Sequence, residues 1–323
     1  MEINQLIKFQ PILKDKIWGG EKLKNVLNKE SDRKDVGESW EISDVKGDTS
    51  VVINGDLKGK NLQQLISEFK ADLVGEKIYK HFGDKFPLLI KFIDAKEALS
   101  IQLHPHDNLA KKRHNSFGKT EMWYVMDANK GANLIVGFNK DVTKDEYAKS
   151  IENDTLLDLM NYETVSEGDT FFINTGKIHA IGAGVLLAEI QQTSDVTYRV
   201  FDFNRRDKNG NLRELHTEQA LDAIDYEKKD DFKVGYNDTK DSVNTMVDCP
   251  YFKTNFIELT QDLDQNVSQR DSFTIYMCVG GKAVISNENG EAAIHKGETI
   301  LVPAISNSIK ITSSGAKLLE VTI

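Results

Sequence analysis

Short segments in which apolar and polar residues alternate run through most of this chain. Examples are 170–174 (TFFIN), 197–204 (TYRVFDFN), 272–279 (SFTIYMCV) and 299–304 (TILVPA), and Gly, Asn, Asp and Ser separate such segments. Alternation with a period of two places successive side chains on opposite faces of a strand, and strands bounded by turn residues are typical of antiparallel sheet. The sequence therefore predicts a mainly β fold.

Helical patterns are confined to three places. Asn61 precedes an apolar stripe over 62–69 and can cap a helix there. Thr143 and Glu146 have the spacing of a capping box, and 216–224 (HTEQALDAI) carries apolar residues at helical spacing. We expect a few helices that decorate a β protein.

Two segments of the chain resemble each other without a gap. Residues 166–181 (SEGDTFFINTGKIHAI) and 295–309 (HKGETILVPAISNSI) each contain a glycine turn with an acidic residue, then an apolar strand, then a short polar loop. The copies differ where His179 of the first falls opposite Ser308 of the second. We infer two related β domains, of which only the first carries this histidine.

The length of 323 residues also suits two domains. The polar stretch 226–244 has runs of charge and few large apolar residues, which indicates a linker. About seven short β segments follow in fewer than ninety residues, a density typical of a sandwich or jelly roll. We predict domains at 1–235 and 236–323.

The charge of the chain excludes several classes of partner. A net charge of −10 and a pI near 5.3 disfavour nucleic acid and anionic membranes, because the summed field repels phosphate. No apolar run approaches the ~18 residues of a membrane span, and the amino terminus does not resemble a signal peptide. Cys249 and Cys278 form no CxxC pair. We predict a cytoplasmic protein.

A candidate metal site combines residues from distant segments. In LSIQLH, Gln102 and His104 share one face of a strand because they are two residues apart. Glu121 begins another β segment, and His179 follows the glycine turn of the repeat. Such N and O donors match zinc best, with iron(II), manganese or cobalt as alternatives. The competing interpretation is that these are unrelated polar side chains, as single His and Glu residues in β proteins usually are. His106 we place either behind the ligands or at the surface, because it follows Pro105.

Several motifs are similar to those of type I mannose-6-phosphate isomerases, zinc-dependent members of the cupin superfamily. They are WGG at 18–20, GESWEIS at 37–43, IQLHP at 101–105, KTE at 119–121 and the long motif HAIGAGVLLAEIQQTSDVTYRVFDFNR at 179–205. The chain reads FGKTE where longer relatives carry Asn-His-Lys-Pro-Glu, and it has little room for their helical domain. It therefore resembles the short bacterial form.

This resemblance implies two cupin jelly-roll barrels with a few helices, of which only the N-terminal barrel is catalytic and binds metal. It implies one zinc ion per chain on Gln102, His104, Glu121 and His179. It further implies catalytic roles for Lys119, Glu189 and Arg199, and substrate-binding positions at Glu38 and Lys91.

Some of these residues are also notable without the resemblance. Glu189 interrupts an apolar strand, so it requires either a cation or a wet cavity. Arg199 alternates onto one predicted face with Phe201 and Phe203, where its stem would cover apolar surface. The cations available for a phosphate are Lys119, Lys177, Arg199 and Arg205.

The implied reaction is the reversible isomerisation of mannose 6-phosphate and fructose 6-phosphate by metal-assisted proton transfer through an enediolate. The implied partner is a small sugar phosphate, with no nucleic acid or membrane, and the protein is expected to be a monomer or homodimer. Two alternatives are a cupin that binds sugar phosphate without turnover and a cupin with another metal-dependent chemistry, such as dioxygenation.

Overall fold

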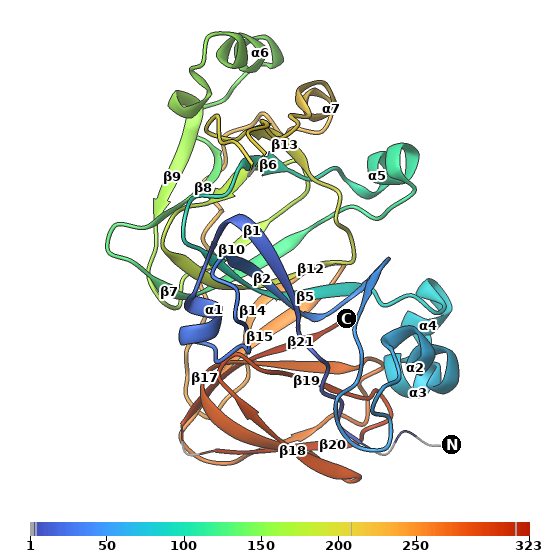
Figure 1. Ribbon diagram of the computed structural model, residues 1–323. Helices are drawn as coiled ribbons and strands as arrows, with labels where there is room; N and C mark the ends of the chain where they lie inside the picture. The colour runs from blue at the N-terminus through green and yellow to red at the C-terminus, as the bar shows by residue number, and fades with distance from the viewer. Residues whose placement is uncertain (1–2, 4, 208, 314) are drawn as a thin grey trace.

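A computed structural model describes residues 3, 5–207, 209–313 and 315–323. Its N-terminal part contains two antiparallel sheets (Figure 1). The first sheet has the strand order β1 (Ile12–Gly20), β2 (Val36–Ile42), β5 (Leu88–Ala95), β12 (Val185–Gln192), β7 (Glu121–Ala128) and β10 (Thr170–Ile173). The second has the order β13 (Tyr198–Phe201), β6 (Ile101–Leu103), β11 (His179–Ile181), β8 (Asn133–Phe138) and β9 (Met160–Thr164).

The C-terminal part is a third, strongly curled antiparallel sheet. Its order is β14 (Asn244–Asp248), β15 (Lys253–Leu259), β21 (Ala316–Thr322), β17 (Thr274–Asn287), β20 (Ser308–Thr312) and β16 (Leu263–Asn266), while β18 (Gly290–His295) and β19 (Thr299–Val302) also pair with β17. A small hairpin, β3 (Asp44–Val45) and β4 (Asp48–Thr49), stands apart. The mainly β cupin architecture predicted from the sequence is confirmed.

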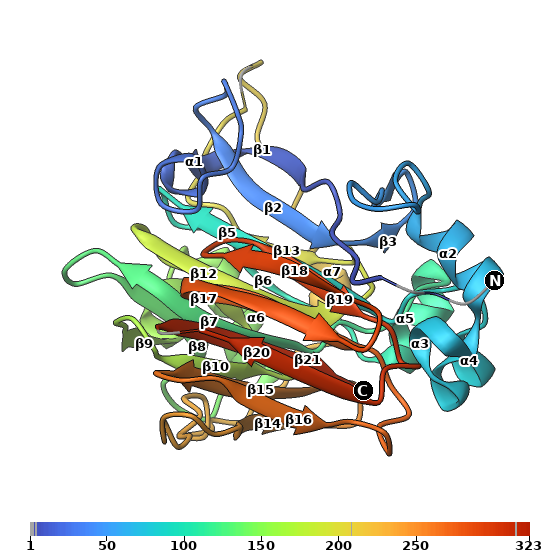
Figure 2. The ribbon, with the colours of Figure 1, turned by 90° about the horizontal axis from the view of Figure 1, so that it is seen from below.

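Figure 1 shows the first sheet between the other two, and in Figure 2, seen from below, the strands of the C-terminal sheet lie in front of it. One face packs against the C-terminal sheet, where the ring of Tyr124 stacks on that of Phe256 with centroids 5.9 Å apart. The other face carries Ile93, Trp123 and Leu187 into a separate core shared with the second sheet. Because β5 and β12 are buried on both faces, their sequences read as near-continuous apolar runs, and charged residues within them require partners.

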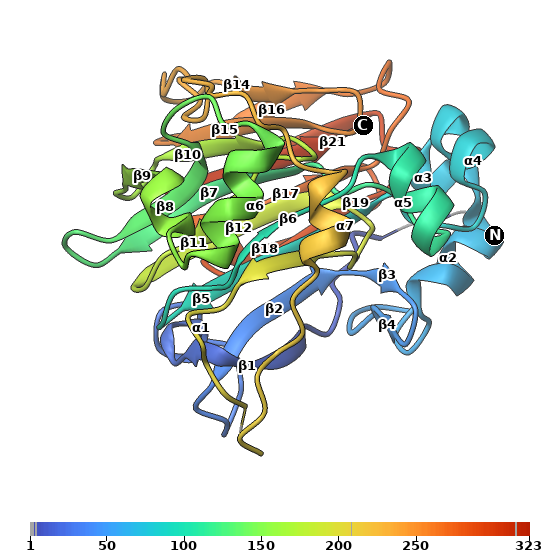
Figure 3. The same ribbon diagram turned by 90° about the horizontal axis from the view of Figure 1, so that it is seen from above.

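Helices cover the edges of these layers. They are α1 (Lys22–Asn25), α2 (Leu62–Phe69), α3 (Ala71–Val74), α4 (Glu76–Phe82), α5 (Asp107–His114), α6 (Lys144–Glu152), the 3-10 helix η1 (Leu156–Leu159) and α7 (Thr217–Leu221). The predicted caps are confirmed, since Asn61 and Thr143 form capping boxes with Gln64 and Glu146. Figure 3 shows α6 and α7 over the second sheet. The sequence did not indicate α1, α3 and α4, each of seven residues or fewer.

The two similar segments of the sequence also have similar structures. Gly168 and Gly297 both adopt left-handed backbone angles, with φ of +93° and +89°, which favour glycine at these turns. Each glycine N–H donates to the strand opposite, to Val125 O at 2.9 Å and to Cys278 O at 2.8 Å. β10 and β19 then begin at equivalent positions, and His179 and Ser308 each begin the next strand.

The two parts of the chain share one core. Ile7 exchanges two backbone hydrogen bonds with Leu301, both 2.9 Å long, so the amino-terminal segment pairs with the C-terminal barrel. Residues 226–243 of the predicted linker 226–244 contain neither helix nor strand, and Asn244 begins β14. Phe232 within the linker is nevertheless buried in the core between the first two sheets. The division at 235/236 therefore stays a proposal. Within the described residues, none of the helices has the length and apolar character of a membrane span.

Candidate active site and metal centre

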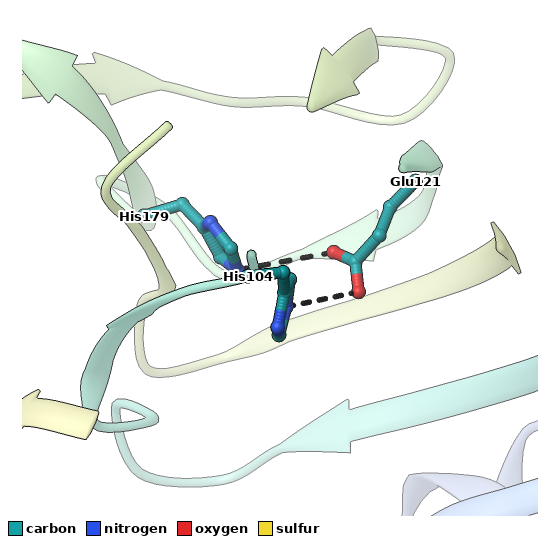
Figure 4. Close-up of side chains that lie close together, drawn as sticks. All are labelled: His104, Glu121 and His179. Atoms are coloured by element: carbon teal, nitrogen blue, oxygen red, sulfur yellow. Dashed lines mark ion pairs between the residues drawn. The ribbon is translucent and has the colours of Figure 1, made fainter. Parts of the chain in front are cut away.

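Three side chains from separate strands converge between the first two sheets (Figure 4). His104 follows β6, Glu121 begins β7 and His179 begins β11, and each is 1% exposed. Glu121 Oε1 lies 3.3 Å from His104 Nε2, and Glu121 Oε2 lies 3.8 Å from His179 Nε2. One atom of each residue lies within 4.8 Å of the others. This spacing allows all three to coordinate one ion.

Gln102 belongs to the same face of the second sheet. It is directly opposite His179 in the β6–β11 pairing, so both side chains project from the same side of the sheet. Gln102 and His179 also line the same pocket. The amide oxygen of Gln102 is thus a candidate fourth donor.

The nitrogen and oxygen atoms that face one another in this cluster are suited to binding a cation. His104 Nε2, His179 Nε2 and both carboxylate oxygens of Glu121 are buried and make no hydrogen bond of acceptable geometry, although Lys119 Nζ lies 2.8 Å from Glu121 Oε1. Buried polar atoms without partners are rare in proteins. The Nδ1 atoms lie 2.9 Å from Val196 O and 2.8 Å from Lys177 O. If these nitrogens carry the protons, both Nε2 lone pairs are free to bind a metal.

The electrostatics of the cluster favour neutral imidazoles at His104 and His179 and an ionised carboxylate at Glu121. Burial and the nearby Lys119 charge lower the pKa of His104 to about 4. Burial also lowers the pKa of His179. For Glu121, burial opposes ionisation, but Lys119 and His104 outweigh it and hold the pKa well below its usual value. Neutral imidazoles and an ionised carboxylate are the forms that bind metal.

The second barrel has different side chains at the corresponding positions. The repeat and the strand pairings place the counterparts of Gln102, Glu121 and His179 at Asn266, Thr274 and Ser308, in that order. The carboxylate and the imidazole are thereby replaced by hydroxyls, which bind zinc poorly, while the amide is kept. We propose that the metal site is confined to the first barrel.

A buried ion pair lies beside the metal cluster. Lys91 and Glu189 are directly opposite in the β5–β12 pairing, and Lys91 Nζ lies 2.9 Å from Glu189 Oε1 and 2.6 Å from Gln191 Oε1. The other Glu189 oxygen accepts a hydrogen bond from Trp123 Nε1 at 2.9 Å. Burial alone would lower the pKa of Lys91, but Glu189 and Glu38 outweigh it and raise that pKa. The cation predicted for Glu189 is therefore Lys91.

Glu38 extends this network on the neighbouring strand. Its carboxylate accepts a hydrogen bond from Trp40 Nε1 at 2.7 Å and lies 3.1 Å from Lys16 Nζ. Burial opposes ionisation, but the Lys91 and Lys16 charges outweigh it and lower the pKa of Glu38 to about 2. Glu38 is thus ionised at neutral pH and can accept hydrogen bonds from a polar ligand.

The Lys91–Glu189 pair yields a stability prediction. Lys91→Met is expected to lower the free energy of unfolding by about 3–5 kcal/mol, because it leaves a buried carboxylate without its counter-charge. Urea denaturation followed by circular dichroism measures the change. Lys317→Met is the matched control, since Lys317 forms an exposed pair with Glu167 and should cost less than about 1 kcal/mol. Equal losses of unfolding free energy in the two variants would contradict the role of Lys91 as the counter-charge of the buried Glu189.

Arg199 lies at the edge of the second sheet, opposite Gln102. Its Nε donates to Ser100 Oγ at 3.3 Å and its Nη1 to Glu214 O at 2.8 Å. The predicted common face with Phe201 and Phe203 is wrong. A register shift between Arg199 and Phe201 turns Phe201 toward the core under the helices, and Phe203 lies beyond the strand with a left-handed φ of +55°.

A cluster of arginines surrounds Arg199. Asp202 is 5% exposed and binds both Arg205, at 2.5 Å, and Arg213. Burial lowers the pKa of Arg199, and Arg213 adds to this effect. Arg205 and Arg213 thus share one carboxylate, while Arg199 binds Ser100 and the Glu214 carbonyl and lies within electrostatic reach of both other arginines. The sequence analysis missed Arg213 and Ser100, although the run of basic residues at 205–213 was a signal for the former.

The remaining sequence candidates lie elsewhere. Lys177 lies 4.3 Å over the ring of Phe232 and 3.9 Å from Asp231, and it does not line the pocket that holds His179. His106 caps α5 from the surface, and His114 lies 2.8 Å from the hydroxyl of Tyr198. Neither histidine takes part in the metal cluster.

Both buried clusters face one small pocket between the first two sheets. Its polar lining consists of Glu38, Lys91, Gln102, Lys119, Trp123, His179 and Glu189. The open volume is about 30 Å³, room for one or two waters. The pocket therefore unites candidate metal ligands with fixed buried charges, an arrangement suited to a polar ligand.

Fold and site together define a two-barrel cupin with one candidate metal centre. The chain matches the type I phosphomannose isomerase catalytic domain over residues 6–149 and the mannose-6-phosphate isomerase cupin domain over 242–321. It is 34% identical to the mannose-6-phosphate isomerase ManA of Bacillus subtilis, with 91% of this chain and 92% of that protein covered. It is 32% identical to the mannose-6-phosphate isomerase of Streptococcus mutans, with 91% and 90% covered.

A solved structure agrees with these sequence matches. The mannose 6-phosphate isomerase of Bacillus subtilis superposes with a TM-score of 0.88 and 31% identity, covering 98% of this chain and 99% of that one. The chain belongs to the type I phosphomannose isomerase family, and the resemblance seen in its motifs is confirmed.

Proposed function

We propose that the protein interconverts mannose 6-phosphate and fructose 6-phosphate as a zinc-dependent aldose–ketose isomerase. The observation that carries the proposal is a single pocket in which a buried His–Glu–His cluster with unpartnered atoms adjoins the buried Lys91–Glu189 pair. Family membership supports the reaction, since the similar proteins ManA and its Streptococcus mutans counterpart are named for it.

The metal in this proposal is held by Gln102, His104, Glu121 and His179. Two imidazoles, a carboxylate and an amide are donors that suit zinc better than the oxygen-only sites of magnesium or calcium. When bound, a divalent ion supplies Lewis-acid stabilisation of negative charge on the sugar oxygens. We propose one zinc ion per chain.

The protein's own groups would position the sugar and move the proton. Isomerisation removes a proton from the carbon next to a carbonyl and delivers one to its neighbour, which requires an acid–base group beside the sugar. Lys119 and Glu189 line the pocket and are the proposed groups for this step. Lys91 and Glu38, which neighbouring opposite charges keep ionised, would bind the sugar hydroxyls.

The arginine cluster would bind the phosphate. Arg199 is half-buried and lies opposite Gln102, so its guanidinium is near the proposed metal site. A guanidinium offers paired N–H donors that match phosphate oxygens. We assign Arg199 to the substrate phosphate and to stabilising negative charge on the reacting sugar.

A cytoplasmic location and a monomeric or homodimeric state also stay predictions.

Removal of the metal tests the core of the proposal. Formation of fructose 6-phosphate from mannose 6-phosphate should fall at least about tenfold after prolonged incubation with a strong chelator, and added zinc should restore it. A coupled spectrophotometric assay measures the rate. Turnover that resists the chelator while the metal is lost would remove the metal from the mechanism, and no turnover by metal-replete protein would overturn the isomerase assignment.

A further inference from the structure

A large cavity reaches Val196, whose carbonyl oxygen lies 2.9 Å from His104 Nδ1. Its volume is about 1240 Å³, and its walls come from the β3–β4 hairpin, the end of α4, α5 with the loop after it, and the segment 192–196. Figure 1 shows α4 and α5 on the same side of the molecule. The cavity shares no lining residue with the pocket that holds Gln102, Lys91 and Glu189. It is therefore a separate site.

The charges that line this cavity balance. Three lysines and three aspartates contribute to the lining, together with two histidines: Lys46, Lys85, Lys111, Asp44, Asp107, Asp195, His81 and His114. A phosphate site needs an excess of cations, and a metal site needs convergent acids. Neither excess is present, so the lining favours an uncharged ligand.

The rest of the lining combines aromatic rings with hydrogen-bonding groups. Phe82 and Phe117 meet edge to face with centroids 5.8 Å apart, and Phe117 is 38% exposed. Gln63, Asn108 and Ser194 add amide and hydroxyl groups. Rings can cover apolar C–H faces, while amides and carboxylates both bind hydroxyls. This combination matches a molecule that carries C–H faces and many hydroxyls.

One carboxylate oxygen of a buried acid at the cavity lacks a hydrogen-bond partner. Asp44 is 5% exposed, and its Oδ2 accepts a hydrogen bond from Phe86 N at 3.0 Å, whereas its Oδ1 makes none of acceptable geometry. Burial raises the pKa of Asp44 despite the Phe86 N–H and the Gln63 amide, which act in the opposite direction. Thr193 Oγ1, which also belongs to the lining, is buried and unpartnered as well. Asp44 and Thr193 both belong to the lining, so a ligand in the cavity would contact these two residues.

We propose that this cavity binds an uncharged sugar, a free hexose or a disaccharide. Its volume exceeds the ~300–1,000 Å³ of typical ligand pockets, so a disaccharide fits. The occupant would contact segment 192–196, which also holds the active site in place. Ser194 O accepts from Gln191 Nε2 at 2.8 Å, Val196 O lies 2.9 Å from His104 Nδ1, and Gln192 Oε1 accepts from Thr120 N at 2.9 Å. Sugar binding itself does not require the proposed isomerase activity.

Isothermal titration calorimetry with trehalose and mannose as probes tests this assignment. Wild-type protein should bind at least one of them at millimolar concentration, with or without saturating fructose 6-phosphate. Phe117→Ala should weaken binding about tenfold, because an aromatic wall is lost from the site. Asp44→Asn, which keeps the side-chain shape, provides a second variant, and its binding should also weaken.

Tyr162→Ala is the control, because Tyr162 is 50% exposed on β9 and does not line the cavity. Its binding should equal that of the wild type. The proposal is overturned if neither sugar binds, if Phe117→Ala and Tyr162→Ala bind equally well, or if fructose 6-phosphate displaces the sugar, which would place it in the active site. Displacement by inorganic phosphate would overturn the assignment to an uncharged ligand.

Discussion

The variant His179→Ala is expected to lose its bound metal and to lower kcat/KM for mannose 6-phosphate by about 1,000-fold or more. His179 supplies one of the two imidazoles of the cluster, and its Nε2 is a buried atom without a hydrogen-bond partner. Charge stabilisation by a metal is worth several kcal/mol, and each 1.36 kcal/mol corresponds to a tenfold rate change. Metal content by plasma emission spectroscopy and the coupled assay measure the two effects.

Ser308→Ala is the matched control, because the internal repeat places Ser308 opposite His179 in the second barrel. Ser308 is exposed, and its Oγ makes one long contact of 3.4 Å with Glu288 Oε2. Metal content and turnover should both be unchanged. Equal losses in the two variants would contradict the confinement of the metal to the first barrel, and full metal content in His179→Ala would exclude His179 as a ligand.

The variant Arg199→Ala should keep its metal and yet lose about 100-fold in kcat/KM. Its guanidinium is proposed to bind the phosphate and the developing negative charge, and loss of one such donor typically costs 100-fold or more. A rise in KM would indicate lost phosphate binding, whereas a fall in kcat alone would indicate a role in the transition state. Arg199→Lys should recover only part of the loss, because an ammonium lacks the planar pair of donors.

Arg33→Ala controls for the general loss of one positive charge, since Arg33 pairs with Asp15 at the surface. Its kinetics should match those of the wild type. Loss of metal from Arg199→Ala would show that the residue supports the metal cluster instead, because its strand lies directly beside Gln102. Normal kinetics in Arg199→Ala would remove it from the substrate site.

Much of the candidate site could be predicted from local sequence rules. Strand alternation placed Gln102 and His104 on one face, and the glycine-turn repeat singled out His179. Alternation failed at Arg199, because the register shift next to it changes which residues share a face. Such a shift depends on pairing with another strand, so it leaves little trace in the local pattern.

The sequence by itself determined the β character of the chain, its two related barrels and the family to which it belongs, because these depend on local periodicity, turn residues and motifs. Only the tertiary structure showed that Lys91 pairs with Glu189 across 98 residues, that Arg213 shares Asp202 with Arg205, and that a large cavity reaches Val196, whose carbonyl contacts His104. These features depend on strand pairings between distant segments. The burial that makes an unpaired charge costly arises only when the sheets pack together.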